Sequence, residues 1–391
     1  MTIRVLGSIL LLIGTSIGGA MLALPVATAA AGFFHSLLLL VLAWIIMLVG
    51  ALFILEVNLW LTHDKNLVSM AKETLGPIGQ VVTWIAYVLL FYTLLSGYIS
   101  GGSDMLSNLL ALIHLHVPRV ISAVIFTLVF GFILFKGISA VDWVNRLLMS
   151  LKLFAYIVLV ALLLPHVNVA YWQGGSYKAL LPATMTAITS FGFAASVPTI
   201  RAYLNSNIKQ VRLVVILGSF VPLICYILWD AAVQGDLSAE HLIAISHSGH
   251  AVSELTKELT LFTHSELINI FAHFFTSICV LTAFLGVGIA VTDFFADGFK
   301  VEKKGFGALL VMLATLFPPF IIVFFHPALF LKAMSFAGVC CVILLALLPS
   351  LMVLSGRYFK KIASIQIVPG GKIVVIAWII ISVILLLIAA R

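Results

Sequence analysis

The stretch GTSIGGAMLALP, residues 14–25, interrupts an apolar run that extends from Val5 to Ala31. A glycine in a helix interior costs about 1 kcal/mol relative to alanine, and a proline about 3 kcal/mol. In a bilayer, backbone groups that leave the helical hydrogen-bonding pattern are tolerated only where they line a cavity or lie buried in protein. The stretch therefore predicts a broken membrane helix whose break forms a binding site.

The composition is that of a membrane protein. The chain has 391 residues, of which 63% are hydrophobic and 9% are charged, whereas soluble domains carry about 25% charged residues. The first apolar run is longer than the roughly 7–15 residues of a signal-peptide core, so we expect it to remain as a spanning segment. The four cysteines lie in apolar segments without a CxxC pair, which predicts free, buried thiols.

The sequence accommodates eleven membrane spans in a single transmembrane domain. Each span needs about 20 predominantly apolar residues. The expected spans are residues 4–31, 34–60, 80–111, 118–136, 144–164, 184–203, 212–233, 265–296, 307–325, 328–353 and 372–390.

The distribution of Lys and Arg predicts the orientation of these spans. The chain carries 21 Lys and Arg and a formal net charge of +7. With a cytoplasmic N-terminus, all of them fall on the cytoplasmic side except Arg119, Lys178, Lys257, Lys332 and Arg391. Because short cytoplasmic loops are enriched in Lys and Arg, we expect a cytoplasmic N-terminus, a periplasmic C-terminus and no nucleic-acid partner.

One outer loop, residues 234–264, is long and acidic. Asp236 or Ser238 is placed to cap one short helix, and Ser253 to cap another. The sequence favours a two-helix lid over an outer vestibule, and an ordinary solvated loop is the alternative.

A short repeat links the first and the sixth spans. Residues 15–20 read TSIGGA and residues 189–194 read TSFGFA, and a proline follows each, Pro25 and Pro198. Five spans separate the two segments, so they cross the membrane in opposite directions. Inverted repeats with discontinuous helices are typical of secondary transporters, whose substrate sites lie at the breaks.

The two breaks suit a zwitterion. A half-helix that begins near Gly19 directs N–H groups and a positive dipole end at a carboxylate, and one that ends near Ile13 offers carbonyl oxygens to an ammonium group. An amino acid carries both charges. The alternative is that the small residues only allow close helix packing.

Further stretches share a family pattern with the first. They are LEVNLWL at 55–61, SGYISGG at 96–102, SFGF at 190–193 and FLGVGIAVTDFFADGFK at 284–300. Together with GTSIGGAMLALP they resemble the hydroxy and aromatic amino acid permeases of the amino acid-polyamine-organocation superfamily, and within that family the bacterial tyrosine/tryptophan permeases. The resemblance covers essentially the whole chain.

The resemblance implies a fold and a function. It implies an all-α polytopic protein with a leucine-transporter-like 5+5 inverted repeat, one repeat at about 4–164 and the other at about 184–353, plus an eleventh helix at about 372–390. It also implies proton-coupled uptake of an aromatic amino acid, tyrosine first, across the bacterial inner membrane. Tryptophan or a small hydroxy amino acid is the alternative substrate, and sodium is the alternative coupling ion.

Lys152 is the leading candidate for proton coupling. It lies about nine residues into the fifth span, where insertion of a charged lysine costs about 2.5–3.5 kcal/mol. In proton-coupled relatives of the wider superfamily, a lysine of the fifth helix stands where sodium-coupled members bind sodium, and Lys152 matches that pattern. The alternative is a lysine that reaches the cytoplasmic surface with its long side chain.

The acidic residues of the spans have other expected roles. Glu56 and Asn58 lie toward the inner end of the second span and Asp293 toward that of the eighth, so Glu56 and Asp293 are expected to form gating ion pairs. Asp104 and Asp230 lie near outer span ends and are expected to face water.

Aromatic side chains and the two breaks supply the expected substrate contacts. Stacking of an aromatic side chain on a substrate ring contributes roughly 0.5–1.5 kcal/mol. The predicted substrate-binding residues are Thr15, Ser16, Ile17, Gly18, Gly19, Tyr92, Tyr98, Ser190, Phe191, Gly192 and Phe193.

Other classes of protein fit the sequence less well. An intramembrane enzyme needs a constellation such as HExxH or GxSxG, and neither is present. A channel needs a filter loop or a charged ring. His114 and His116 are too few ligands for a metal ion, so we predict no metal site and no cofactor. The expected partners are the substrate, protons and the bilayer, and a monomer is sufficient.

Overall fold

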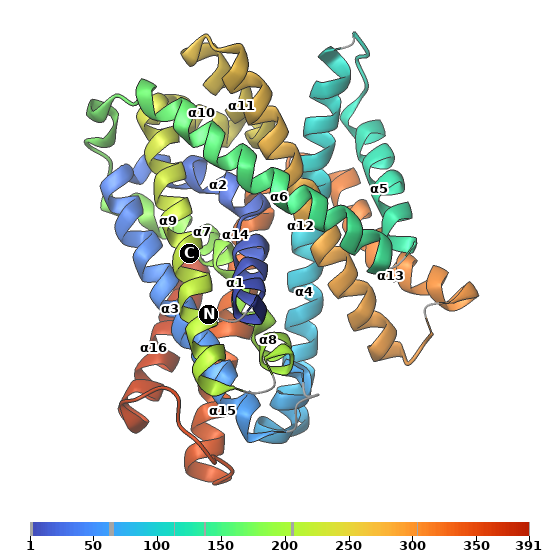
Figure 1. Ribbon diagram of the computed structural model, residues 1–391, viewed down its shortest axis with the longest axis vertical. Helices are drawn as coiled ribbons and strands as arrows, with labels where there is room; N and C mark the ends of the chain where they lie inside the picture. Colours follow the sequence, from blue (N-terminus) through green and yellow to red (C-terminus); the bar gives the residue numbers. More distant parts are fainter. Residues whose placement is uncertain are drawn as a thin grey trace.

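The computed structural model describes residues 3–61, 66–112, 114–136, 138–204, 207–302 and 304–390. Helices account for nearly all regular structure in these ranges, and no strand occurs among them. The helices form one bundle (Figure 1).

The first half of the chain forms several long apolar helices and several short helical turns. Its elements are α1 (Ile3–Ser16), α2 (Gly19–Thr28), η1 (Ala29–Ala31), α3 (Phe33–Trp60), α4 (Leu67–Leu112), α5 (Arg119–Phe135), α6 (Ile138–Leu163), η2 (Leu164–His166), η3 (Val169–Trp172) and η4 (Tyr177–Ala179).

The second half begins with another broken span. Its elements are α7 (Leu180–Ser190), η5 (Gly192–Ser196), α8 (Val197–Tyr203), α9 (Ile208–Asp236), α10 (Ala239–Ser248), α11 (Ala251–Thr263), α12 (Glu266–Phe299), α13 (Gly305–Phe325), α14 (Phe330–Cys341), η6 (Val342–Leu347), α15 (Leu348–Leu354), η7 (Ser355–Phe359) and α16 (Gly371–Ala389).

The apolar helices agree with the expected spans. In the described ranges, nine helices are long and apolar enough to cross a membrane, and α1 with α2 forms a tenth span bent by 51°. The helix α5, of 17 residues, is a shorter apolar helix at the place of the expected fourth span. The inverted repeat and its boundaries remain a prediction.

The third span begins earlier than its expected start at residue 80. The helix α4 starts at Leu67 and continues through a kink at Gly76, whose φ of 82° lies in the left-handed region. Glycine populates that region without the steric cost of a side chain, and Pro77 follows it as the first residue of the membrane helix. The segment before the kink therefore forms a separate helical turn at the end of the bundle.

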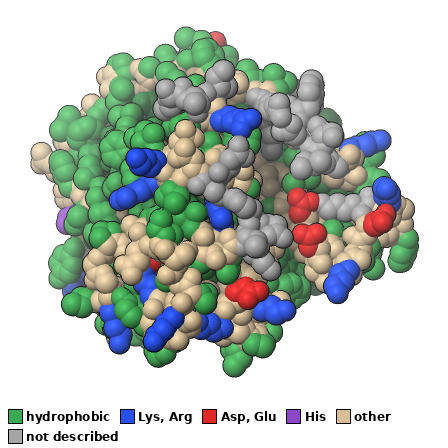
Figure 2. All heavy atoms as spheres, turned by 60° about the horizontal axis from the view of Figure 1, so that its bottom comes forward, with side chains coloured by type: hydrophobic (Ala, Val, Ile, Leu, Met, Phe, Trp, Pro, Cys, Tyr) green, Lys and Arg blue, Asp and Glu red, His purple; other side chains and the backbone are tan. Residues whose placement is uncertain are grey.

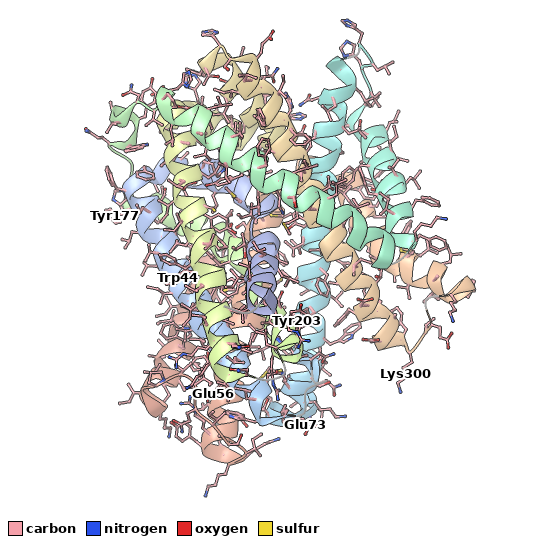
Figure 3. The ribbon with its side chains drawn as sticks, in the orientation of Figure 1. Trp44, Glu56, Glu73, Tyr177, Tyr203 and Lys300 are labelled. Atoms are coloured by element: carbon pink, nitrogen blue, oxygen red, sulfur yellow. The ribbon has the colours of Figure 1, made fainter. Side chains whose placement is uncertain are left out.

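The two ends of the bundle differ in charge. Figure 3 shows Glu56, Glu73, Tyr203 and Lys300 in the lower half of the view, with Tyr177 in the upper half. Lys and Arg side chains gather over the lower end, which Figure 2 turns toward the viewer. The exposed ones include Lys72, Lys209, Arg212, Lys300, Lys304, Lys360, Lys361 and Lys372. We refer to this end as the basic end.

The outer loop folds into two helices at the opposite end, α10 and α11 (Figure 1). The helix α10 contacts η1 and α2, and α11 contacts α2, α4, α9 and α12. The pair therefore covers the outer half of the broken first span. Ser238 precedes α10, but its side chain pairs with His241 instead of capping the helix. The expected cap at Ser253 is wrong, because α11 starts at Ala251 after His250.

Candidate functional site

The break in the first span releases backbone carbonyls. The helix α1 ends at Ser16, and Gly18 is extended with φ −161° and ψ −155°, so the helical pattern stops before α2. The amide of Ile17 still donates to Ile13 O at 2.9 Å, but that of Met21 donates to Gly18 O at 3.2 Å. The carbonyls of Gly14, Ser16 and Ile17 thereby lose their usual helical donors and accept from side chains instead.

Lys152 occupies this break from the side of α6. Its Nζ donates to Ile17 O at 2.6 Å, to Gly14 O at 3.1 Å and to Thr282 Oγ1 of α12 at 3.2 Å. The side chain is 1% exposed. Hydrogen bonds from a charged donor are about twice as strong as neutral ones. The ammonium therefore ties the broken first span to α6 and α12, and it does not reach the cytoplasmic surface.

The sixth span breaks at the expected place. The helix α7 ends at Ser190, Phe191 leaves the helical region with φ −101° and ψ 30°, and η5 continues to α8. The 3₁₀ turn keeps Phe193 inside the bundle and leaves Gly192 half-buried. The carbonyl of Ser190 thus faces the first break across the bundle.

Tyr226 of α9 joins the two breaks. Its hydroxyl lies 2.7 Å from Ser16 O and 2.7 Å from Ser190 O, and its ring packs edge-on against Phe191 at 5.0 Å between centroids. The side chain is fully buried. Sequence reasoning missed Tyr226, although a tyrosine near the middle of the seventh span is a signal that could have found it.

The three glycines at the breaks differ in how closely neighbouring atoms approach them. A Cβ on Gly19 would lie 2.6 Å from Cε1 of Tyr98, so this glycine lets the Tyr98 ring lie against the break. At Gly18 the nearest atom would be the Cβ of Ala283 at 3.5 Å, and at Gly192 the Sγ of Cys341 at 3.9 Å. Tyr98 thus lies at the site, and a Cβ at either of the other two glycines would make only ordinary van der Waals contact.

Several positions near the breaks are exposed. Gly286 and Ala290 on α12 are exposed, and they lie on the helix face of Ala283, which borders Gly18. Ala195 and Thr199 on the inner half of the sixth span are exposed as well, and so is Thr15. Tyr98, Phe191, Tyr226 and Ser190 are buried. The side chains at the junction of the two breaks are therefore buried in the bundle.

The contacts of Tyr92 lie away from the two breaks. Its hydroxyl donates to Ala314 O of α13 at 2.8 Å, and its ring lies 5.8 Å from that of Phe295. These contacts place Tyr92 between α4, α12 and α13. A groove of about 460 Å³ between α5 and α13 also lies apart from the breaks, and none of the predicted site residues lines it.

Glu56 forms a buried ion pair near the basic end. Its carboxylate accepts from Nε and Nη2 of Arg357, each at 2.6 Å, and from the amides of Ile367 and Val368 at 2.7 and 3.0 Å. Both side chains are almost fully buried. The pair ties α3 to η7 and to the loop that precedes α16.

Two other polar residues lie near the same end. Arg201 of α8 donates to the backbone carbonyl of Asn58 and, at 3.0 Å, to its Oδ1. Asp293 is half-buried toward the inner end of α12. Asn58, Arg201 and Asp293 therefore lie at the inner ends of α3, α8 and α12. The gating role predicted for Glu56 and Asp293 remains a prediction.

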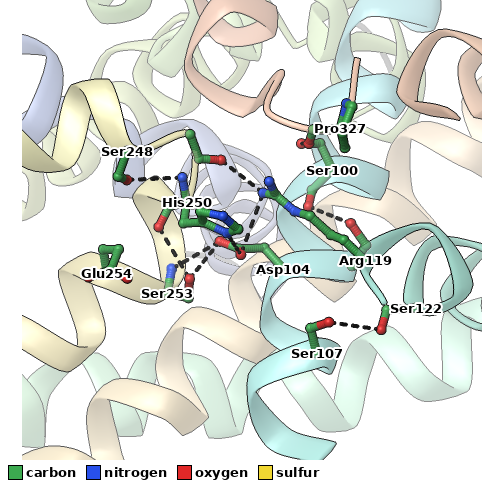
Figure 4. A network of polar contacts seen from close by, with 12 residues as sticks. Ser100, Asp104, Ser107, Arg119, Ser122, Ser248, His250, Ser253, Glu254 and Pro327 are labelled. Carbon is green, nitrogen blue, oxygen red and sulfur yellow. Dashed lines mark hydrogen bonds and ion pairs between the residues drawn. The ribbon is translucent and has the colours of Figure 1, made fainter. Parts of the chain in front are cut away.

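The expectation that Asp104 faces water is wrong. Asp104 is 3% exposed, because α11 covers it. Its Oδ1 lies 2.7 Å from Nδ1 of His250 and 3.5 Å from Nη2 of Arg119, and its Oδ2 accepts from the amide and hydroxyl of Ser253 (Figure 4). The carboxylate satisfies an amide of the first turn of α11 from a neighbouring helix.

Asp230 is buried as well, contrary to expectation. It is 0% exposed on α9, and its Oδ2 lies 3.3 Å from Thr28 Oγ1 and 3.3 Å from Nε2 of Gln234. The spacing of Asp230 and Gln234, four residues apart, places both on one helix face and could have indicated a polar cluster.

The fold and the two joined breaks define a class of protein. A membrane bundle with paired discontinuous helices and a buried cation at one break is a secondary transporter. A solved structure shares the fold: a crystal structure of MhsT in complex with L-phenylalanine matches 98% of this chain and 97% of that chain, with a TM-score of 0.66 and 14% sequence identity. The chain is therefore an all-α membrane protein with the leucine-transporter fold.

The sequence comparisons identify the family. Residues 1–389 match the model of the tryptophan/tyrosine permease family, and the chain belongs to this family. A relative from Haemophilus influenzae, tyrosine-specific transport system 1, is 30% identical over 90% of this chain and 88% of its own length. Glutamine transporter 2 of Aliivibrio fischeri is also 30% identical, over 91% of this chain and 90% of its own length. The protein is an amino acid transporter of the membrane and not an enzyme.

Proposed function

We propose that the protein takes up an aromatic amino acid, tyrosine before tryptophan, together with protons across the bacterial inner membrane. The observation that carries the proposal is the bridge from Lys152 to Gly14 O, Ile17 O and Thr282 Oγ1. A buried ammonium with these partners is a cation supplied by the protein itself, at the point where the first span can bend.

The bridge supports a mechanism for coupling. While Lys152 is charged, its hydrogen bonds hold α1 and α12 against α6. Loss of the proton leaves a neutral amine, whose hydrogen bonds are weaker, so the inner half of the first span is free to move. The exposed stripe of Gly286 and Ala290 gives water from the basic end a route toward the site. Protonation then restores the bridge.

The substrate is assigned from the rings and helix ends at the breaks. Phe191 precedes Gly192 at the second break and Tyr98 lies against Gly19 at the first, and an aromatic substrate gains about 0.5–1.5 kcal/mol from contact with such a ring. The amides that start α2 face the carboxylate of the substrate, and the carbonyls at Ser16 and Ser190 face its ammonium group. The name of the Haemophilus relative supports tyrosine as the first candidate.

The proposal includes the arrangement in the membrane. Residues 4–164 and 184–353 form the two inverted repeats, and residues 372–390 form the additional helix. The basic end faces the cytoplasm, in accord with the enrichment of Lys and Arg in cytoplasmic loops, and the α10–α11 lid faces the periplasm.

The test is uptake of labelled tyrosine into proteoliposomes with pH and sodium gradients imposed separately. We expect accumulation with an inward proton gradient, and its collapse when a protonophore is added. Unlabelled tyrosine, tryptophan and phenylalanine should compete, with tyrosine the strongest.

Two outcomes would contradict the proposal. Accumulation that follows a sodium gradient and ignores pH would exclude proton coupling. Competition by glutamine or serine that exceeds that of every aromatic amino acid would exclude the aromatic substrate, and it would place the chain nearer in specificity to the Aliivibrio relative.

A further inference from the structure

We propose that Asp230 is a proton-binding group on the outer side of the transporter, neutral in this conformation and loaded from the periplasm when the lid opens. The inference goes beyond the proposed role of Lys152, since the two groups lie at opposite ends of the substrate site. Only its transport arm rests on the proposed function.

The surroundings of Asp230 do not match those of a carboxylate. The side chain is 0% exposed, its Oδ1 has no hydrogen-bond partner, and no salt bridge reaches it in the described part of the chain. Leaving a buried charge unpaired costs several kcal/mol, and buried acidic groups avoid this cost by staying protonated. A neutral carboxyl is therefore the species that fits the site.

The hydrogen bonds around Oδ2 of Asp230 also favour a neutral carboxyl group. Thr28 has one hydroxyl hydrogen, and Leu24 O lies 2.8 Å from its Oγ1, closer than Asp230 Oδ2 at 3.3 Å. With that hydrogen donated to Leu24, the contact between Thr28 and Asp230 is favourable only if the carboxyl supplies the proton. A protonated Oδ2 donates to Thr28 Oγ1, which can accept it.

A metal cation fits the cluster poorly. The oxygens of Thr28, Asp230 and Ser36 surround Nε2 of Gln234 at 3.0, 3.3 and 3.5 Å. The amide nitrogen thus takes the centre that a bound cation would need. It also donates into the cluster, which leaves the carboxyl as the group that can gain or lose a proton.

The basic groups described on α9 and on the elements packed against it are engaged elsewhere or lie at the surface. Those with partners of their own are His35, bound to Ala31 O, His166, bound to Leu162 O, Lys152 at the first break, Arg201 at Asn58 and Lys257 beside Glu254; Arg4, Lys209 and Arg212 are exposed. The acidic groups are Glu56 on α3, paired with Arg357, Glu254 and Glu258 on α11, and Asp236 on α9 itself, whose two oxygens have no hydrogen-bond partner. The buried phenols are Tyr156 and Tyr226, which donate to backbone carbonyls.

The position of Asp230 explains how the proton is exchanged. Thr28 ends α2, the outer half of the broken first span, and α10 covers α2 and η1. Trp172 of η3 covers the same end of α9, with its Nε1 donating to Ala231 O at 3.0 Å. When α2 and the lid separate from α9, water reaches the carboxyl and a proton passes between them. Closure then traps the neutral acid.

The first test uses infrared spectroscopy of the purified protein and needs no substrate. A neutral carboxylic acid has a C=O band distinct from amides and carboxylates, and we expect one such band of the wild type to be lost in Asp230→Asn. Asp236→Asn, on the same helix, is the matched control and should keep the Asp230 band. Identical carboxylic acid bands in the wild type and Asp230→Asn, across the pH range, would overturn the proposal. A band that is lost on adding sodium would also overturn it, in favour of a cation site.

The second test measures uptake in proteoliposomes at fixed inner pH and varied outer pH. On the alkaline side, wild-type uptake should fall about tenfold for each pH unit, because occupancy of one proton site follows the proton concentration. Asp230→Asn should show a shallower dependence on outer pH, because only Lys152 then responds to it, and should still exchange labelled substrate in counterflow. An unchanged dependence on outer pH would contradict the proposal. If the wild type itself exchanges no aromatic amino acid, the proposed function fails, and the infrared test still decides the state of Asp230.

Discussion

Gly19 is the glycine of the first break that the packing requires. A Cβ there would lie 2.6 Å from Cε1 of Tyr98, closer than real side-chain contacts. We expect Gly19→Ala to displace the Tyr98 ring and to destabilise the protein by about 1–3 kcal/mol, the usual effect of overpacking. The midpoint of thermal unfolding in detergent measures this change.

Gly192→Ala is the matched control, because the nearest atom to its Cβ would be the Sγ of Cys341 at 3.9 Å. Its unfolding midpoint should equal that of the wild type, and equal midpoints for the two alanine variants would refute the packing argument. A leucine side chain extends beyond the Cβ into the proposed substrate site, so Gly18→Leu and Gly192→Leu should stay folded and lose substrate binding in a thermal-shift titration.

The residue scale also shows where sequence reasoning stops. The repeat at residues 15–20 and 189–194 predicted both breaks, because glycine and proline act locally on the backbone. The partners of Tyr226 and Asp230 depend on how α9 packs against α1, α2 and α7, which no local pattern encodes. Asp104 and Asp230 were expected in water because they lie near span ends, and the lid and α2 cover them instead.

At the scale of elements, the span from α14 to η7 contains two π-helical segments, η6 and η7. Pro349 lacks the amide that would bond to Leu345 O, and its ring displaces that carbonyl. The Leu345 carbonyl approaches Gly50 of α3, where any side chain would collide with it. The sequence contains both residues, but only the packing of α3 on this span relates Gly50 to Pro349.

The ion pair of Glu56 and Arg357 should stabilise the basic end. Glu56→Gln leaves the Arg357 guanidinium buried without its counter-charge, and removing one partner of a buried pair costs about 3–5 kcal/mol. We expect lower thermal stability and greater proteolysis of the loop between η7 and α16. The double variant Glu56→Gln with Arg357→Met should recover part of the loss, and additive effects of the two single changes would show that the pair does not act as a unit.

Asp104 should hold the start of the lid helix α11. Replacing it by Asn removes the charge that faces His250 and Arg119 and weakens its bonds to Ser253. The loss of a cap is worth about 1 kcal/mol, so amides in the first turn of α11 should exchange hydrogen faster. Glu254→Gln, in the same turn but paired only with Lys257, is the control. Equal exchange in the two variants would mean that Asp104 does not hold the lid.

At the scale of the whole molecule, the basic end and the lid define the two sides of the membrane. A membrane-impermeant maleimide should label Ser248→Cys in intact spheroplasts and Lys361→Cys only after the membrane is opened. The native thiols give a low background, since Cys279, Cys340 and Cys341 are buried and Cys225 is half-buried. Labelling of Lys361→Cys from outside would reverse the orientation.

The molecule as a whole was more predictable than its site. Long apolar segments predict spans almost regardless of packing, so the described helices agree with the expected ones to within a few residues at most ends. The kink at Gly76 and the exposed inner face of α12 required the structure. Lys152 was a candidate because of its place in a span, but its three partners come from α1 and α12, more than a hundred residues away.

The most direct test of the account is transport by Lys152→Met in proteoliposomes. Methionine keeps an unbranched apolar chain but can neither carry a charge nor donate to the carbonyls of the break. Lys209→Met, at an exposed position of the basic end, is the control. We predict that Lys152→Met retains counterflow of labelled aromatic amino acid and fails to accumulate it under an inward proton gradient, while Lys209→Met does both. Normal gradient-driven accumulation by Lys152→Met would contradict the account.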